Sequence, residues 1–440
     1  MMRGAATLLI SILAACSGSD YPTGEAKAQP APIPPEKAGS GSAAPIAGSG
    51  AGSACNCDSD DLTDRDDDRK GPPHDVLTLT KQTYKDLPAW NDDKHSEAVA
   101  SFLKSCEKLN ALKDNDPVGH DGHGGLAKQW RSACKAAAKL KAGDDAAAKA
   151  FFEAEFVPWQ AAGKTGVDGK MTGYFVQEMK GSRKKQGKYQ TPVYARPKDL
   201  VMVDLSKHIK DSHGRRIWGR LTDKGDLEPY FTRKEIRLGA LDTKKLELMY
   251  IDEPIDLMFA HIEGSAKARM DDGTVVWLDF GGKNGRSGGG LGGVIKGMGG
   301  LKTPGSGTMQ GIRKWLADNR AKLNDVFDQV SSFVFFEEAK QQGAMGSQMV
   351  VLSARRSVAI DRAFIAQSTP IWVDTRAPVA NSTAVGPWRQ LVIAQDTGGN
   401  ILGAVRGDIY WGDDQAAGDI GGRMGGKGRF WLLLPKGVTK

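Results

Sequence analysis

The chain has 440 residues, of which 60 are Lys or Arg and 53 are Asp or Glu, giving a formal net charge of +7, and 40% are hydrophobic. These values are ordinary for a soluble globular protein and exclude a polytopic membrane protein, while the basic excess is too diffuse to identify an anionic partner. Glycine is unusually frequent, with 55 residues against a usual share of about 7%. Since no Gly-X-Y period accompanies it, collagen is excluded, and we expect the excess in linkers and in turn-rich β structure.

The chain begins with the features of a secretory signal. Arg3 precedes an apolar run that ends at Ala15, which is too short to span a bilayer and is followed by polar sequence. Because small residues stand directly before Cys16, the segment resembles the lipobox of bacterial lipoproteins, and we predict a signal peptide over 1–15 and lipidation of Cys16. By the same resemblance, Ser17 is compatible with delivery to the periplasmic face of an outer membrane. An ordinary cleaved signal with an incidental cysteine is the alternative.

A tether and a set of cysteines follow. Residues 16–75 are rich in Ala, Gly, Ser and Pro and cannot bury a core, which predicts a flexible tether. The chain has five cysteines, and removing Cys16 leaves four in an envelope that permits disulfides. Cys106 and Cys134 fall at core-facing positions of two predicted helices. A disulfide between them and two buried free thiols are both open.

The first part of the folded region is predicted to be helical. Apolar side chains from Val99 to Leu109 share one helical face, Trp130 and Cys134 mark a second helix, and Asp144 offers an N-cap before a third over 146–156. After Gly163 the pattern changes to short runs of β-forming residues bounded by Gly, Asp and Lys. We expect one further helix near 310–327 and strands at 173–176, 191–194, 275–278, 333–336, 349–352, 371–373, 391–394, 409–411 and 430–434.

Two glycine-rich stretches show no motif for a phosphate-binding loop or a metal site. Residues 281–307 lack the Gly-Lys-Ser/Thr of a phosphate loop, which predicts a flexible surface loop. His120 and His123 also lie among glycines and have no third ligand nearby in the sequence, so we expect no metal site.

Carboxylates are the best candidates for catalysis. Asp396 lies in Gln-Asp-Thr-Gly-Gly, and Asp408 lies in Arg-Gly-Asp-Ile-Tyr-Trp-Gly. A carboxyl beside Ile409, Tyr410 and Trp411 is of the kind that desolvation keeps protonated near neutral pH, ready to act as an acid. The alternative is structural, with one Asp capping a turn and the other paired with the neighbouring Arg.

The Asp396-Thr397-Gly398 motif also suggests an aspartic protease. Such an enzyme needs two aspartates about 3 Å apart that share one proton. This chain has one such motif, since Asp374-Thr375 continues with Arg376. We therefore keep the protease only as a distant alternative.

These carboxylates lie in a longer pattern that is recognisable. Residues 394–412 and 428–435 resemble the C-terminal part of the MltA family of membrane-bound lytic murein transglycosylases, and the likeness extends over about residues 101–435. It is carried by dispersed blocks in one order: Thr172-Gly173-Tyr174, Arg183 with Gly187 and Tyr189, Pro229-Tyr230 with Arg233 and Glu235-Ile236, Asp256, Gly264-Ser265, Gly282-Lys283-Asn284-Gly285, Ser332 to Phe336 and Arg356 to Ala359.

The resemblance implies a mainly β fold with peripheral helices. A double-psi β-barrel domain would be split by an inserted second β-barrel-like domain, with a groove for a glycan strand between them. On this chain the helices and the first part of the barrel domain would occupy 76–180, the insert 181–331 and the second part of the barrel 332–437.

The resemblance also implies roles for particular residues. Asp408 matches the family's catalytic aspartate, with Asp396, Gly398, Gly399 and Arg406 supporting the site. The family motifs that contact the glycan would place seven substrate-binding residues here: Thr172, Gly173, Tyr174, Gly264, Ser265, Lys283 and Asn284. For Tyr174, Lys283 and Asn284, ordinary packing is the alternative. No cofactor, metal or nucleic acid is implied; the partners would be peptidoglycan strands, a membrane through Cys16 and, as candidates, cell-wall synthesis complexes.

The implied activity is cleavage of the β-1,4 bond between N-acetylmuramic acid and N-acetylglucosamine, with a 1,6-anhydromuramyl product. One Asp would act first as acid and then as base. The alternative is a peptidoglycan-binding lipoprotein impaired in catalysis. The sequence departs from the family pattern at Glu263, where Gln is usual, at Ala266, where Gly is usual, after Tyr174, and over 286–300, where glycines replace a different motif.

Overall fold

The computed structural model describes residues 75–209, 216–286, 290–303, 305–399 and 401–438. The predicted signal peptide, Cys16 and all but the last residue of the predicted tether lie outside these ranges. Within the described ranges, no helix is both long enough and apolar enough to cross a membrane.

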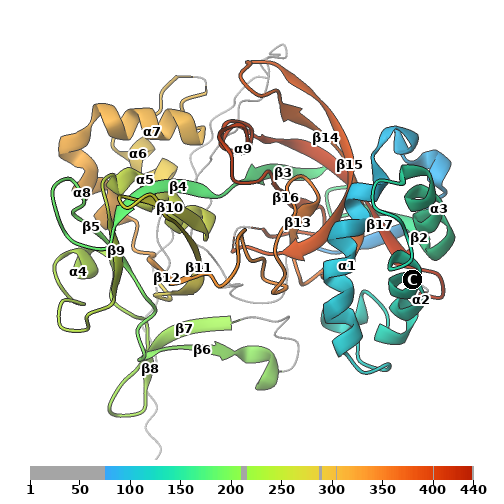
Figure 1. Cartoon of the computed structure of the whole chain (residues 1–440), viewed down its shortest axis with the longest axis horizontal. Coiled ribbons are helices and arrows are strands. Elements are labelled where there is room, and N and C mark those ends of the chain that lie inside the picture. Colours follow the sequence, from blue (N-terminus) through green and yellow to red (C-terminus); the bar gives the residue numbers. More distant parts are fainter. Residues whose placement is uncertain (1–74, 210–215, 287–289, 304, 400, 439–440) are drawn as a thin grey trace, which may run out of the picture. The chain divides into compact units, whose positions relative to one another are not determined.

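The larger sheet closes into a barrel. Its strands run in the order β1-β2-β17-β14-β15-β13-β16-β3, and β17 also pairs with β3, so the last six form a ring (Figure 1). Two pairs in the ring, β13 with β15 and β16 with β3, are parallel. The strands are β1 (Thr78–Lys81), β2 (Phe156–Ala162), β3 (Gly169–Tyr174), β13 (Ser357–Ile360), β14 (Pro370–Pro378), β15 (Val385–Asp396), β16 (Arg406–Tyr410) and β17 (Gly425–Pro435). The expectation of a mainly β fold is confirmed.

Apolar runs in the barrel strands are continuous because both faces of the sheet are covered. In β17, Phe430 and Leu432 point into the barrel core, whereas Trp431 and Leu433 pack under helices on the outside. Successive side chains of a strand point to opposite faces, so a strand covered on both sides needs no polar alternation. This explains the run from Phe430 to Leu434 near the C-terminus.

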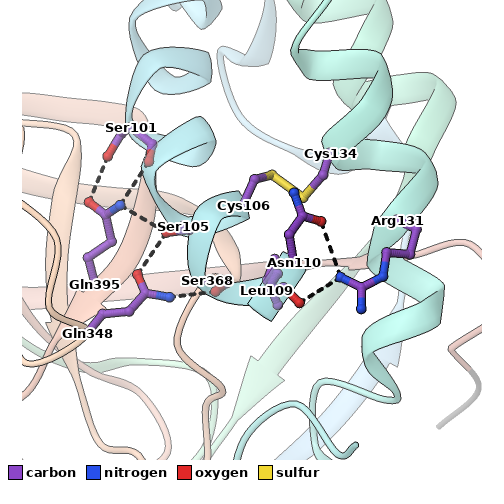
Figure 2. Close-up of a disulfide and its surroundings, with 10 residues drawn as sticks. All are labelled: Ser101, Ser105, Cys106, Leu109, Asn110, Arg131, Cys134, Gln348, Ser368 and Gln395. Atoms are coloured by element: carbon purple, nitrogen blue, oxygen red, sulfur yellow. Dashed lines mark hydrogen bonds between the residues drawn. A yellow bond between two sulfur atoms is a disulfide. The ribbon is translucent and has the colours of Figure 1, made fainter. Parts of the chain in front are cut away.

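Three helices cover the outer face of β14, β15 and β17: α1 (His95–Ala111), α2 (Ala127–Ala137) and α3 (Asp145–Glu155). Asp144 caps α3 through a bond from the backbone N–H of Ala147, as its sequence position predicts. Cys106 of α1 and Cys134 of α2 are joined by a disulfide (Figure 2). Of the two states left open by the sequence, the structure has the disulfide.

A buried polar network connects α1 to the barrel beside this disulfide (Figure 2). Gln395 donates to Ser105 at 2.9 Å and accepts from Ser101 at 2.8 Å. Ser105 also donates to Gln348, which in turn donates to Ser368. Buried side-chain amides of this kind are stable because their donors and acceptors are bonded.

The second sheet has the order β12-β11-β10-β4-β9-β5, and three shorter strands form a separate sheet β6-β7-β8. The strands are β4 (Gln177–Ser182), β5 (Thr191–Tyr194), β6 (Leu200–Asp204), β7 (Arg216–Leu221), β8 (Leu227–Glu228), β9 (Glu247–Ile251), β10 (Ala266–Met270), β11 (Val275–Lys283) and β12 (Val334–Glu338). Because β4 and β12 belong to it, the second sheet begins before residue 181 and ends after residue 331.

The glycine-rich stretch contains a helix, which corrects the prediction of a surface loop over 281–307. In α6 (Leu291–Gly297), Leu291 and Ile295 are buried, and Val294 packs against the same cluster. Apolar residues at positions i, i+3 and i+4 form one helical face, and burial of that face offsets the low helix propensity of the glycines around it. Residues 287–289 and 304 of this stretch lie outside the described ranges.

The remaining helices are α4 (Arg233–Arg237), α5 (Pro254–Glu263), α7 (Met309–Asp318), α8 (Leu323–Gln329) and α9 (Gln415–Gly421). The single helix expected near 310–327 is two, α7 and α8, separated by a 3-10 turn. The strand expected at 349–352 is wrong: Met349 has a left-handed φ of 60°, and the segment makes only the isolated bridge of Val351 to Met345. Short 3-10 helices lie at Tyr84–Asp86, Trp90–Asp92, His120–Gly122, Leu205–Lys207 and Arg320–Lys322.

Candidate active site on the barrel

Strand β16 presents Asp408 on the outer face of the barrel. Ile409 belongs to the barrel core, so Asp408 and Tyr410 on either side of it point away from the core. Asp408 pairs with Thr172 of β3 and with Ala359 of β13. The β3 residues Thr172 and Tyr174 therefore lie on the same face as Asp408.

The Asp408 carboxyl is half-buried and accepts one strong hydrogen bond. The Thr172 hydroxyl donates to its Oδ1 at 2.6 Å. Burial raises the pKa of Asp408, and the charges of Arg406 and Lys170 and the Thr172 hydrogen bond lower it, with a net rise. A carboxyl of this kind holds a proton at a higher pH than an exposed Asp does, which suits a general acid.

Asp396 is brought to the same face by a register shift in β15. Val358 of β13 pairs with Ala394, but the next residue, Ala359, pairs with Asp396, so Gln395 is skipped. A shift of one residue moves a side chain to the other face. Gln395 points instead to α1, where the network of Figure 2 holds it.

Asp396 differs from Asp408 in its hydrogen bonding. It accepts from the backbone N–H of Ser347 at 2.8 Å, from that of Thr397 at 2.9 Å and from the Tyr174 hydroxyl at 2.8 Å. Burial still gives a net rise in its pKa. The Tyr174 ring lies 5.3 Å from the Tyr410 ring. Asp396 thus anchors Tyr174 and a loop, which agrees with a supporting role.

The two aspartates do not form a protease dyad. Both pair with Ala359, one from each side, so the intervening strand keeps their backbones roughly 10 Å apart at ordinary strand spacing. Aspartic proteases need carboxyls about 3 Å apart. The Asp-Thr-Gly sequence at 396–398 therefore lacks the geometry that its resemblance to a protease motif requires.

The glycines predicted around the site serve close packing. A Cβ on Gly173 would lie 2.5 Å from the indole nitrogen of Trp411, so any other residue would clash with the Trp411 side chain directly after the strand that carries Asp408. Gly398 accepts from the backbone N–H of Ile401 in the turn after Asp396. Gly399 is buried in the same turn. Arg406 is buried next to Asp408, and its guanidinium donates to the Gly407 carbonyl.

Helix α5 of the second sheet's domain reaches this face through its C-terminal end. Glu263 accepts a hydrogen bond at 3.1 Å from the backbone N–H of Phe175, directly after β3. Gly264 ends the helix with a φ of 77°, and Ser265 is buried. A second contact joins the same regions, since Lys267 donates to the Asp413 carbonyl at 2.7 Å. Gly264 and Ser265 therefore lie near the end of β3, and their contact with a glycan stays a prediction.

Lys283 and Asn284 are placed differently from the prediction. The Asn284 side chain is fully buried and donates to the carbonyls of Phe231 and Ser331, each at 2.8 Å, while its oxygen accepts from the N–H of Phe333 at 2.9 Å. Lys283 is 2% exposed. Neither side chain is open to a ligand, so the predicted glycan contacts of these two residues are not supported.

Two residues near the site were not predicted as part of it. Ser347 binds Asp396 from a loop with no hydrophobic period, and the sequence offers no signal for it. Glu263 was noticeable only as a departure from the resembling family's motif. Its carboxyl has a pKa raised well above the usual value by burial and by the charge of Asp408, against the lowering effect of the Phe175 hydrogen bond.

Comparison with known proteins gives consistent matches over most of the folded region. Residues 170–337 match the family model of the MltA specific insert domain, and residues 356–434 match that of the 3D domain. Membrane-bound lytic murein transglycosylase A of Escherichia coli strain K12 is 28% identical over 335 residues, covering 74% of this chain and 80% of the relative.

Solved structures are similar over most of the chain. The structure of MltA from Neisseria gonorrhoeae, monoclinic form, is 28% identical with a TM-score of 0.69, covering 84% of this chain and 96% of that one. The lytic transglycosylase LtgG of Burkholderia pseudomallei is 32% identical with a TM-score of 0.54, covering 83% of this chain and 98% of that one.

Proposed function

The chain belongs to the MltA family of lytic murein transglycosylases, and from that premise we propose that it cleaves the β-1,4 bond between N-acetylmuramic acid and N-acetylglucosamine in peptidoglycan. The single observation that carries the proposal is the Asp408 carboxyl. It is half-buried on the outer barrel face, bonded to Thr172, with a raised pKa.

One carboxyl is sufficient for this chemistry. Protonated Asp408 donates its proton to the glycosidic oxygen, and the bond to C1 of the muramyl residue breaks with oxocarbenium character. The carboxylate then takes the proton from the C6 hydroxyl of the same sugar as that oxygen bonds to C1. The products are a 1,6-anhydromuramyl end and a free N-acetylglucosamine C4 hydroxyl, and Asp408 is protonated again. No water is consumed, so no second carboxylate or cofactor is needed to activate one.

The surrounding residues would hold the strand in place. Thr172 orients the acid, and Tyr174, fixed by Asp396, offers an aromatic face near Asp408. Gly264 and Ser265 at the end of α5 would contribute from the inserted domain. Its bounds, proposed from the sequence at about 181–331, widen to about 177–338 if all strands of its sheet belong to it. The glycan would lie between this domain and the barrel.

The location proposed for the enzyme is the periplasmic face of the outer membrane. A lipid on Cys16 would anchor it, residues 16–75 would act as the tether, and cell-wall synthesis complexes are candidate partners. Arg3, the apolar run before Cys16 and Ser17 support this proposal.

Digestion of purified sacculi tests the function. We expect the wild-type protein to release 1,6-anhydromuropeptides, identified by mass, and Asp408→Asn to release none above background. Circular dichroism and thermal unfolding of both proteins show that each is folded. Folded wild type that binds sacculi without releasing anhydro products contradicts the proposal and favours a binding lipoprotein. Products with reducing muramyl ends would indicate hydrolysis instead.

A further inference from the structure

Glu263 is a carboxyl that the proposed mechanism does not use. It is the last residue of α5, and its Oε2 reaches the backbone N–H of Phe175 at 3.1 Å. Phe175 lies three residues along from Thr172, the donor to Asp408. At a strand rise of about 3.3 Å per residue, this places the Glu263 carboxyl roughly 10 Å along β3 from the acid.

The end of β3 is also fixed against the end of β16. The Trp411 N–H donates to the Tyr174 carbonyl, and the Val176 N–H donates to the Gly412 carbonyl, each at 2.9 Å. Glu263 therefore lies over the end of the strand pair that carries Asp408. The two carboxyls belong to the regions of different sheets and lie roughly 10 Å apart along this strand pair.

The charges around the two carboxyls are unequal. Asp408 is influenced by the cations Arg406 and Lys170 and by the Thr172 hydroxyl. The groups that act on Glu263 are the Phe175 N–H and the negative charge of Asp408, and burial is the largest effect. Tyr174, between them, has its own pKa raised by burial and by Asp396 and is neutral near pH 7. Asp408 is therefore the better stabilised of the two when ionised.

We propose that Glu263 and Asp408 form a coupled pair of carboxyls that together carry no more than one negative charge over the working pH range. Glu263 is a positioning residue in this pair: it touches neither sugar nor acid, and it acts on Asp408 through its charge. The inference rests on the proposed function, because it concerns the protonation of the proposed acid.

Coupling widens the pH range over which Asp408 can act as a general acid. When two carboxyls repel each other, the pair loses its protons in two separated steps. Between these steps, a fraction of the molecules keeps the proton on Asp408 while Glu263 is ionised, and these molecules remain competent as acids. Without the Glu263 charge, Asp408 ionises in a single step and this fraction disappears.

The pH dependence of Glu263→Gln tests the coupling. Gln keeps an oxygen for the Phe175 N–H but carries no charge. We measure release of anhydromuropeptides from about pH 4 to about pH 9, a range that brackets shifted carboxyls, and normalise each profile to its own maximum. We call the decline of activity at high pH the basic limb of the profile. We expect this decline to begin at lower pH in E263Q than in wild type, and the relative rate of E263Q to be about threefold lower at the high-pH end of the decline.

A matched control is Glu337→Gln, which removes an exposed carboxyl from the second sheet. Its normalised profile should coincide with that of wild type. If E263Q also coincides with wild type, Glu263 only caps the backbone and the proposal is overturned. If both variants shift equally, the effect is one of net charge, which also overturns it.

A measurement without catalysis separates this inference from the proposed function. Glu side chains labelled with ¹³C at Cδ are titrated by NMR, and the Glu263 signal is identified by its loss in E263Q. We expect the Glu263 midpoint to fall by about half a pH unit or more in Asp408→Asn, because the repelling charge is gone. An unchanged midpoint overturns the pair even in an active enzyme. An inactive wild type with a shifted midpoint contradicts the function but supports the pair.

Discussion

The end of β3 and the end of β11 each carry a short polar motif next to glycine, and their environments are opposite. Thr172 and Tyr174 lie on the outer barrel face and bind the two site aspartates. Asn284, directly after β11, is fully buried and binds four backbone groups. Both motifs were predicted to touch substrate from the same family resemblance.

The two motifs differ in burial because the backbone groups beside them differ in whether they already have hydrogen-bond partners. Around Asn284, the carbonyls of Phe231 and Ser331 and the N–H of Phe333 form hydrogen bonds outside any strand ladder. One amide side chain binds all three, and it also accepts from the N–H of Arg286. Buried backbone groups require such partners. At the end of β3 the ladders with β16 and β17 already satisfy the backbone, so the polar side chains remain available to one another and to a ligand.

Of the substitutions considered, Asp408→Asn should lower activity the most. It should not destabilise the fold, unlike a substitution of the buried Asn284. Loss of the only acid and base should lower kcat by about 10³-fold. Because the pKa of Asp408 is raised in the folded state, the fold is stabilised at low pH, where the carboxyl is protonated, and loses that stability as pH rises through the folded pKa. Asn does not ionise and so does not lose stability as the pH rises. The unfolding temperature of D408N at pH 8 should therefore equal or exceed that of wild type.

Asn284→Ala should show the reverse pattern. The backbone partners of this buried side chain lose their bonds to it, which should lower the free energy of unfolding by about 3 kcal/mol in urea titration. The kcat of the folded fraction should remain within about twofold of wild type, since the side chain is closed to ligands. Asn115→Ala, at an exposed position, is the control and should change stability by less than about 0.5 kcal/mol. A stable N284A with a raised KM would restore the predicted glycan contact.

The contrast also shows what sequence could predict. Asp408 was predictable, because its motif matches that of the resembling family and because apolar residues follow it directly in the chain. The fold class followed from the dispersed motifs. The burial of Asn284 was not predictable, because its partners at 231, 331 and 333 are distant in the chain.

Two other features needed the structure. The register shift that turns Asp396 onto the Asp408 face depends on pairing with β13 and on the anchoring of Gln395 by α1. Helix α6 was hidden among glycines, although Leu291, Val294 and Ile295 had the spacing of a helical face. Composition outweighed periodicity in that prediction, and the helix is there because its apolar face packs against α5, α7 and α8.

Asp396→Asn sharpens the comparison within the site itself. Asn keeps the oxygen that accepts from Ser347 and Thr397, but an amide nitrogen replaces the charged oxygen that accepts from the Tyr174 hydroxyl, so stability should fall by about 1–2 kcal/mol. Activity should fall by about tenfold, because the charge-assisted bond that holds Tyr174 is replaced by a weaker one from the amide. The basic limb of the pH profile should stay in place, because Asp408 is the titrating acid. A limb that moves with this substitution would assign the acid to Asp396.

Thr172→Val is the smallest change and tests the hydrogen bond at the acid directly. The Thr172 hydroxyl stabilises the Asp408 carboxylate and so lowers its pKa. Val has a similar shape without the donor, so the pKa should rise and the basic limb of the activity profile should move to higher pH by less than about one unit. Thr172→Ser retains a donor and should keep the wild-type limb. A shift to lower pH in the Val variant would mean that the hydroxyl stabilises the protonated acid, and Thr172 would then orient the proton rather than the carboxylate.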